Sequence, residues 1–531
     1  MAAGSTHRAL LLSAQRAASA ADLAWLRKTE VDPALRAQVR TLLSERGWES
    51  LADAVSGGGY AADELPLVAR QLGHLAVRAE LAKVRPRLAL LMAARVPIQH
   101  GSETLIRLVE QLFGSAAIPH AQGSLTTHDY ALSAQLDGEA HDWTACRSRA
   151  KRTLGEHTAK ARRMCRLDRG PDVQSAPTTS IILTDVAAPA VEPPAPSVIA
   201  SGHVLATEPA STREPEHERV SDAANAWLSA TDDAFEDMSR WLMRQGGAAG
   251  ADTWSARFRA LRAPQFDGLA RPVRRLVRLA ESARRLGFAR ELTSNMHAEH
   301  ANACLVPCSR VLALSVPDDV RVFESRSEFG VLSDLAAARA IGEGLACALV
   351  SPAQSDVLRM ACGLGVSAAI GGLFLQLRAD PRFLGRVEGH APDVSERLAR
   401  HAAIVVLALS RLHAALAWAE EQTVPTESER LEVMCAVVER ALGCRLPPGV
   451  TAIAYLASAV DGADFTALDA GLALHAALRE RFDEDWYLNP RVSDVLRGAC
   501  TRGSLLSIGD FRTELAAHAA LGASRLLELI E

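Results

Sequence analysis

A proline-rich stretch between residues 171 and 218 constrains the fold more than any other feature of this sequence. Eight prolines fall in it among Ala, Ser, Thr and Glu: Pro171, Pro177, Pro189, Pro193, Pro194, Pro196, Pro209 and Pro215. Proline lacks a backbone donor and breaks helices, and few large apolar side chains are present to offset the entropy cost of ordering. We therefore expect a disordered linker at 171–218, which divides the chain into an N-terminal region, 1–170, and a C-terminal region, 219–531.

Both flanking regions predict helices. Ala, Leu and Arg dominate them, and aromatic residues make up only 5% of the 531-residue chain; these three residues are good helix formers. The exception lies at 303–323, where Val and Leu alternate around Pro317-Asp318-Asp319, a pattern typical of a β-hairpin. We expect a mainly α fold: a helical N-terminal region, the linker, and a helical C-terminal domain with a small β-hairpin.

The cysteines and the charge exclude several classes of protein. Nine cysteines are scattered through apolar stretches, which argues against a disulfide framework and for a reducing compartment. The apolar run at 9–12 is too short for a signal peptide, so we expect a cytoplasmic protein. A formal net charge of -5 does not suit a chain that binds nucleic acid as a whole.

A basic stretch at 147–169 is the local exception to this charge. It holds nine basic residues: Arg147, Arg149, Lys151, Arg152, Lys160, Arg162, Arg163, Arg166 and Arg169. Such a run can contact a phosphate backbone, or it can be the solvated face of one long helix. No aromatic residues are interleaved with it for base stacking, so we expect the second and no nucleic-acid partner.

An apolar segment at 360–377 tests the expectation of a soluble chain. Its eighteen residues contain only Ser367 and Gln376 as polar side chains, whereas a spanning helix needs roughly 20 apolar residues. Because Ala and Gly supply more of it than Leu or Ile, we expect a helix buried in a large helical domain and no membrane association.

The C-terminal region resembles a known family in the order of its segments. The hairpin is followed by a helix at 332–349, then Val350-Ser351-Pro352, an apolar helix at 366–377 and Asp380-Pro381. Near the end stands the segment from Leu478 to Pro490. This succession resembles the catalytic half of the thimet oligopeptidase/oligoendopeptidase family of helical zinc metallopeptidases, over roughly 300–528. The resemblance implies a peptidase fold and a peptide-binding groove.

The residues at the family's metal-binding positions do not match its chemistry. In that family a His-Glu-x-x-His motif on the first helix supplies two zinc ligands and the general base, and a Glu on the next helix supplies the third ligand. The resemblance places these positions at Arg339-Ala340-Ile341-Gly342-Glu343 and at Ala368. A guanidinium repels a divalent cation and a methyl group has no lone pair, so we expect neither zinc nor peptidase catalysis here.

The same helix has a purely structural interpretation. Leu335, Ala338, Gly342, Leu345 and Leu349 form one apolar stripe that predicts core packing, with Gly342 and Gly344 allowing close helix contact. Arg339 and Glu343 stand four residues apart, so a salt bridge between them is expected, worth roughly a few tenths of a kcal/mol if exposed.

A second group of residues offers soft metal ligands. His297, His300, Cys304 and Cys308 would share one face of a continuous helix, and such N/S donors suit zinc. Pro307 and the expected hairpin interrupt that helix, and Cys-x3-Cys is not a usual zinc spacing. We expect chance clustering, and keep these four as the ligands of a relocated site if the protein binds zinc at all.

Three functional hypotheses follow. The first is a non-catalytic, peptidase-like protein (a pseudoenzyme) that binds a peptide or protein partner without a cofactor. The second is an active metallopeptidase whose metal site has moved to the His/Cys group. The third is a helical interaction scaffold unrelated to peptidases, in which no hairpin would lead into the helix at 332 and no second helix would cross it near Ala368.

Overall fold

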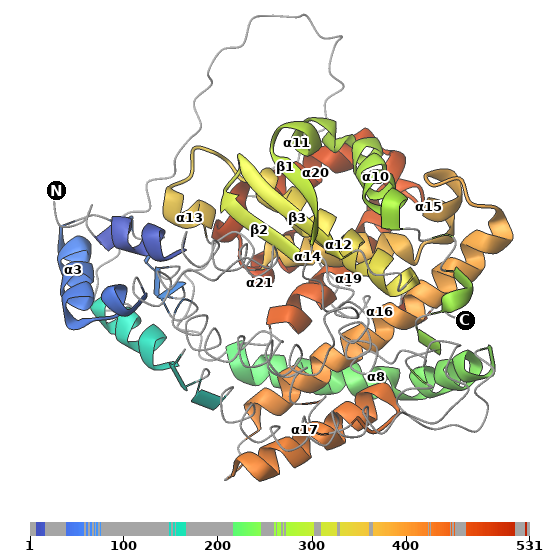
Figure 1. Ribbon diagram of the computed structural model, residues 1–531, viewed down its shortest axis with the longest axis horizontal. Coiled ribbons are helices and arrows are strands. Elements are labelled where there is room, and N and C mark those ends of the chain that lie inside the picture. The colour runs from blue at the N-terminus through green and yellow to red at the C-terminus, as the bar shows by residue number, and fades with distance from the viewer. Residues whose placement is uncertain are drawn as a thin grey trace, which may run out of the picture.

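The computed structural model confirms a mainly α protein with a small sheet (Figure 1). It describes residues 7–15, 39–57, 60–75, 148–165, 216–245, 257–301, 310–325, 330–360, 365–451, 463–515 and 526–527, with gaps of a few residues within several of these ranges. Residues 171–215 of the predicted linker lie outside the described part. Its last three residues are helical instead, because α8 begins at Glu216, directly after Pro215.

Helices make up most of the described chain. Those discussed below are α3 (Glu45–Ser56), α8 (Glu216–Gln245), α10 (Pro272–Ala283), α11 (Ala289–Ser294), α12 (Gly330–Ala348), α13 (Asp356–Met360), α14 (Val366–Arg378), α15 (Pro381–Arg386), α16 (Pro392–Glu421), α17 (Glu427–Leu442), α19 (Ala463–Phe482), α20 (Pro490–Arg502) and α21 (Ile508–Leu515). Short helical turns lie at η2 (Pro264–Phe266), η3 (Arg284–Phe288), η4 (Trp486–Leu488) and η5 (Gly503–Leu505).

Local sequence signals explain where several helices begin. Asp380 caps α15 by accepting hydrogen bonds from two backbone amides, and Pro381 follows at the first turn. Asn489 and Pro490 start α20 in the same way. Thr426 forms a capping box at the start of α17, in which its side chain and that of the third helical residue each accept from the other's backbone.

The sheet has three strands in the order β1-β3-β2. The predicted hairpin is confirmed: β2 (Arg310–Ser315) and β3 (Asp319–Ser325) pair antiparallel around the turn at Pro317. Strand β1 (Met296–Ala301) was not predicted and pairs parallel with β3. Figure 1 shows the sheet lying over α12, which is the next described element after β3 in the chain.

Glycines bring three helices into close contact in the core. A Cβ added at Gly342 of α12 would lie 2.7 Å from the carbonyl oxygen of Ile370 on α14. A Cβ added at Gly471 of α19 would lie 2.4 Å from the carbonyl oxygen of Ala369. Both distances are shorter than side chains tolerate, so α14 is held at backbone distance between α12 and α19. The close contact predicted at Gly342 is therefore confirmed.

The apolar segment at 360–377 is not one helix. α13 ends at Met360 and α14 starts at Val366, after Gly365 with a φ of 96° that most other residues avoid. α14 is only 13 residues long, and nearly all of it is buried. Among the described residues, α16 has the length and composition to cross a membrane, yet 78% of its most apolar window is buried inside the protein.

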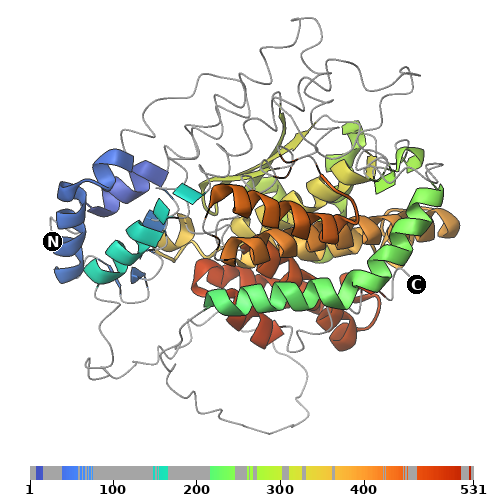
Figure 2. The same ribbon diagram turned by 90° about the horizontal axis from the view of Figure 1, so that it is seen from below.

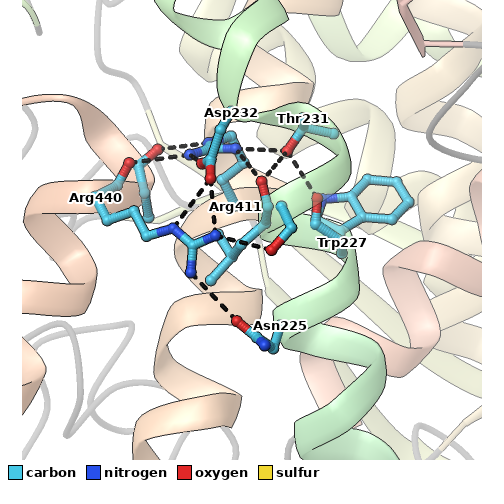
Figure 3. A network of polar contacts seen from close by, with 9 residues as sticks. Asn225, Trp227, Thr231, Asp232, Arg411 and Arg440 are labelled. Atoms are coloured by element: carbon cyan, nitrogen blue, oxygen red, sulfur yellow. Dashed lines mark hydrogen bonds and ion pairs between the residues drawn. The ribbon is translucent and has the colours of Figure 1, made fainter.

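Helix α8 packs along α16 beside α17 (Figure 2). Arg411 of α16 fixes this arrangement, since its side chain is 1% exposed and all five of its N–H groups are used. They donate to the backbone carbonyls of Leu228, Arg440 and Ala441, and to the side chains of Thr231 and Asp232 (Figure 3). The cation thus lies at the C-terminal end of α17, where helix carbonyls are unpaired.

The described residues form two hydrophobic clusters. The smaller one joins 11–75 with Ala161 and Cys165, and the larger one joins residues from 224 to 526. Buried polar pairs cross the smaller cluster: His7 Nδ1 lies 2.8 Å from Tyr60 Oη, and Gln15 donates to Gln71. In Figure 1 the N-terminal helices are blue to teal, and the larger helical body is green to red. The domain boundaries themselves stay a prediction.

Candidate functional site

The candidate site is an ion cluster on the exposed edge of α12. Arg339 Nε donates to Glu343 Oε1 over 2.7 Å, which confirms the salt bridge expected from their four-residue spacing. The guanidinium also reaches a residue that the sequence did not indicate: Arg339 Nη2 lies 3.5 Å from Asp464 Oδ1 at the start of α19. The guanidinium of Arg339 therefore links α12 to α19, through two residues that lie 125 positions apart in the chain.

The cluster is half-buried. The side chains of Arg339, Glu343 and Asp464 keep 23%, 24% and 29% of their exposure. Burial alone would lower the pKa of Arg339, but the carboxylates of Glu343 and Asp464 more than offset this and hold that pKa above its ordinary value. The guanidinium is thus a permanent positive charge between two carboxylates.

His413 of α16 adds a third helix to the cluster. Burial lowers the pKa of this imidazole. The negative charge of Asp464 raises that pKa, and the positive charge of Arg339 lowers it further. Its Nδ1 is buried and has no hydrogen-bond partner among the described residues. The lowered pKa favours the neutral form of this imidazole, which lies beside the charged groups of Arg339 and Asp464.

Helix α14 passes directly beneath this cluster. A Cβ added at Gly371 would lie 2.7 Å from Glu343 Cγ and 3.0 Å from the carbonyl oxygen of Arg339. Ala368 lies on α14 one turn before Gly371, and its methyl group is partly exposed. The positions that the family resemblance singles out thus lie on two helices in close contact.

The residues at these positions do not fit a zinc ion. Arg339 presents a guanidinium, Ala368 and the 1%-exposed Ala340 present methyl groups, and Glu343 is engaged by Arg339. Tetrahedral zinc sites need three or four lone-pair donors within about 2.3 Å of the ion. Across the ranges that the structure describes, no group of three or more His, Cys, Asp and Glu side chains is arranged to hold a metal.

The His/Cys group does not form the helical face that its spacing would require. His297 and His300 belong to strand β1, so the helical spacing that would align their side chains does not apply. His297 is exposed. Cys304 and Cys308 lie outside the described residues. The five cysteines that are described, Cys165, Cys347, Cys435, Cys444 and Cys500, are free thiols.

A second ion cluster, largely buried, joins α12 to α14. Arg378 Nη2 of α14 lies 2.6 Å from Asp334 Oδ2 of α12, and Arg378 also pairs with Glu388. Arg278 of α10 pairs with the same two carboxylates. Burial alone would raise the pKa of Glu388, but the charge of Arg378, the imidazole of His390 at 3.3 Å, and the charge of Arg278 together lower it to about 2. The sequence did not indicate this network, because its members come from separate segments.

Comparison with known proteins shows distant structural similarity. No protein-family model and no curated protein matches the chain. A Bacillus carboxypeptidase is similar in structure, with 11% sequence identity, a TM-score of 0.48 and coverage of 99% of both chains. The carboxypeptidase of Pyrococcus furiosus has 10% identity, a TM-score of 0.47 and the same coverage. Similarities of this size carry no argument about activity, and the resemblance to the thimet oligopeptidase family stays a prediction.

Proposed function

We propose that this chain is a non-catalytic, peptidase-like protein that acts by binding a peptide or protein partner. One observation carries the proposal: the guanidinium of Arg339 is paired with Glu343 and Asp464 at the positions where the sequence resemblance puts a metal. A fixed positive charge there repels a divalent cation, and it also occupies the carboxylate that could have bound one.

The framework around this position does not depend on a metal. Gly342 and Gly371 let α12 and α14 touch along their backbones, and Arg378 and Asp334 pair the same two helices in the protein interior. These contacts supply the bridge between helices that a metal would otherwise provide. Retention of the framework together with loss of the ligands supports a binding role rather than catalysis.

The cluster offers a partner several polar contacts. Glu343 and Asp464 keep about a quarter of their side-chain exposure, so their carboxylates are partly accessible to a partner. Partly desolvated charges of this kind contribute more to binding specificity than fully solvated ones. A cytoplasmic location, favoured by the free cysteines, belongs to the same proposal.

A peptide-cleavage assay separates this proposal from an active enzyme. The full-length protein and a His300→Ala variant are incubated with a peptide mixture, with and without a chelator, and the products are read by mass spectrometry. We expect no cleavage by either protein. Chelator-sensitive cleavage that the variant loses would establish the relocated metallopeptidase instead.

Affinity selection from the same peptide mixture tests the binding half of the proposal. Peptides retained by the full-length protein are expected to bind at least tenfold more weakly to a Glu343→Ala variant, which lacks one of the two carboxylates that the cluster offers to a partner. The matched control is Asp393→Ala, which removes the carboxylate of another four-residue ion pair, with Arg397 on the exposed face of α16. Equal affinity for both variants would place binding elsewhere.

A further inference from the structure

A basic helix face in the N-terminal region exposes arginines that make no ion pair with the described residues. The described residues between 148 and 164 are helical, and Ala161 and Cys165 bury one side in the smaller hydrophobic cluster. The opposite side exposes four guanidiniums, those of Arg149, Arg152, Arg162 and Arg163. In the part of the chain that the structure describes, none of the four makes a hydrogen bond or ion pair.

Many surface arginines in the C-terminal region are paired, in contrast. Arg240, Arg284 and Arg397 each bond to a carboxylate three or four residues away. Along the basic face the sequence offers few such partners: residues 147–169 hold nine basic residues against two acidic ones. The chain as a whole has a net charge of -5, so this local excess stands out. Four unpaired cations gathered on one helix face indicate a site for an anionic partner.

The charges on this face are spaced in a specific pattern. At 3.6 residues per turn the four arginines fall within an arc of about 140°. At 1.5 Å per residue, the pair Arg149/Arg152 lies about 18 Å along the axis from the pair Arg162/Arg163. Glu156 is exposed between the two pairs. Lys160 is held aside, with its Nζ 4.7 Å from the centre of the Trp48 ring.

We propose that this face docks an acidic segment of a partner protein. A strand-like peptide advances about 3.3 Å per residue, so two acidic pairs five to six residues apart would meet the two arginine pairs. The carboxylate of Glu156 then faces the middle of the peptide and favours a basic or neutral residue there. A nucleic-acid backbone carries negative charge throughout and would be repelled at Glu156. This surface is independent of the Arg339 cluster.

A designed peptide tests the pattern on the full-length protein. The probe is a fluorescein-labelled Glu-Glu-Ser-Lys-Ser-Glu-Glu peptide, and its control has the same residues with the four Glu contiguous. Fluorescence anisotropy is measured at low and at physiological salt, because contacts of this type weaken with ionic strength. A double-stranded oligonucleotide is titrated in parallel.

Two quadruple variants complete the experiment. One reverses the face: Arg149→Glu, Arg152→Glu, Arg162→Glu and Arg163→Glu. The other reverses four exposed arginines elsewhere: Arg244→Glu, Arg290→Glu, Arg445→Glu and Arg491→Glu. Circular dichroism checks that both variants are folded.

We expect the patterned peptide to bind the wild type and the control variant alike, and the face variant at least tenfold more weakly. The peptide with contiguous Glu should bind less well than the patterned one. Equal binding to both variants, no binding to the wild type, or tighter binding of the oligonucleotide than of the peptide would each overturn the proposal.

Discussion

Replacement of Arg411 by alanine tests how α8 is attached to the helical body. Arg411 and Arg440 both bond to Asp232, with distances of 2.6 Å from Arg411 Nη2 and 2.7 Å from Arg440 Nη2 (Figure 3). They differ in burial: the Arg411 side chain is 1% exposed, while that of Arg440 is 39% exposed. The variants Arg411→Ala and Arg440→Ala therefore remove the same kind of ion pair from two different environments.

The structure predicts very different costs. In Arg411→Ala, the carbonyls of Arg440 and Ala441 lose their donor at the buried end of α17, while Asp232 keeps Arg440. Two buried carbonyls left without a donor cost about 1–3 kcal/mol each, so this variant should lose about 3–5 kcal/mol. In Arg440→Ala, Asp232 keeps Arg411, and an exposed pair of this kind contributes at most about 1 kcal/mol. The expected difference is thus about 2–5 kcal/mol.

Urea denaturation followed by tryptophan fluorescence measures this difference, since Trp227 of α8 is buried beside the network. Thermal unfolding should show a loss of at least about 6 °C for Arg411→Ala, at about 2 °C per kcal/mol for a body of this size. If Arg411→Ala costs no more than Arg440→Ala, the guanidinium does not hold α8 in place and the interpretation of this network is wrong.

Two further predictions concern the helical core. Gly471→Ala places a methyl group 2.4 Å from the carbonyl oxygen of Ala369, so the free energy of unfolding should fall by about 2 kcal/mol or more. The control is Gly498→Ala, where nothing lies within 4 Å of the new Cβ and the free energy of unfolding should rise by up to about 1 kcal/mol. Equal effects of the two variants would contradict the close contact of α14 and α19. The pKa of Glu388 is lowered to about 2, so this carboxylate contributes about 3 kcal/mol to the stability of the fold above pH 4.5, and the contribution is lost as the pH falls toward 2. Glu388→Gln should abolish this part of the pH dependence of the free energy of unfolding. If the variant shows the same pH dependence as the wild type, the buried ion network is not its source.

Features that depend on neighbouring residues could be predicted from the sequence. The stripe of Leu335, Ala338 and Leu345 on α12 is buried as its helical spacing indicated. The pairing of Arg339 with Glu343 follows from positions four apart, which face each other on any helix.

Features that depend on distant segments could not be predicted. Strand β1 has the sequence Met-His-Ala-Glu-His-Ala, with no β-branched residues, and is a strand because β3 pairs with it. Asp464 and His413 join the Arg339 cluster from helices whose local sequence carries no sign of this contact. The positive φ of Gly365 prevents the apolar segment from forming one continuous helix, and a hydropathy pattern carries no information about φ.

A gain-of-function variant tests whether the correspondence with a metal site is right. Arg339→His, Glu343→His and Ala368→Glu together would place two imidazoles and a carboxylate on α12 and α14. We expect this triple variant to bind zinc, since two His residues four apart share one helix face. Failure of the folded variant to bind zinc would show that these positions do not converge as the resemblance implies.

The most direct measurement of the central claim is the zinc content of the wild-type protein. The purified full-length chain is equilibrated with zinc, freed of loosely held ions, and analysed by inductively coupled plasma mass spectrometry. Because Arg339 stands at the position that the family resemblance assigns to a metal ligand, the expectation is far less than one zinc per chain. One tightly bound zinc per chain would contradict it.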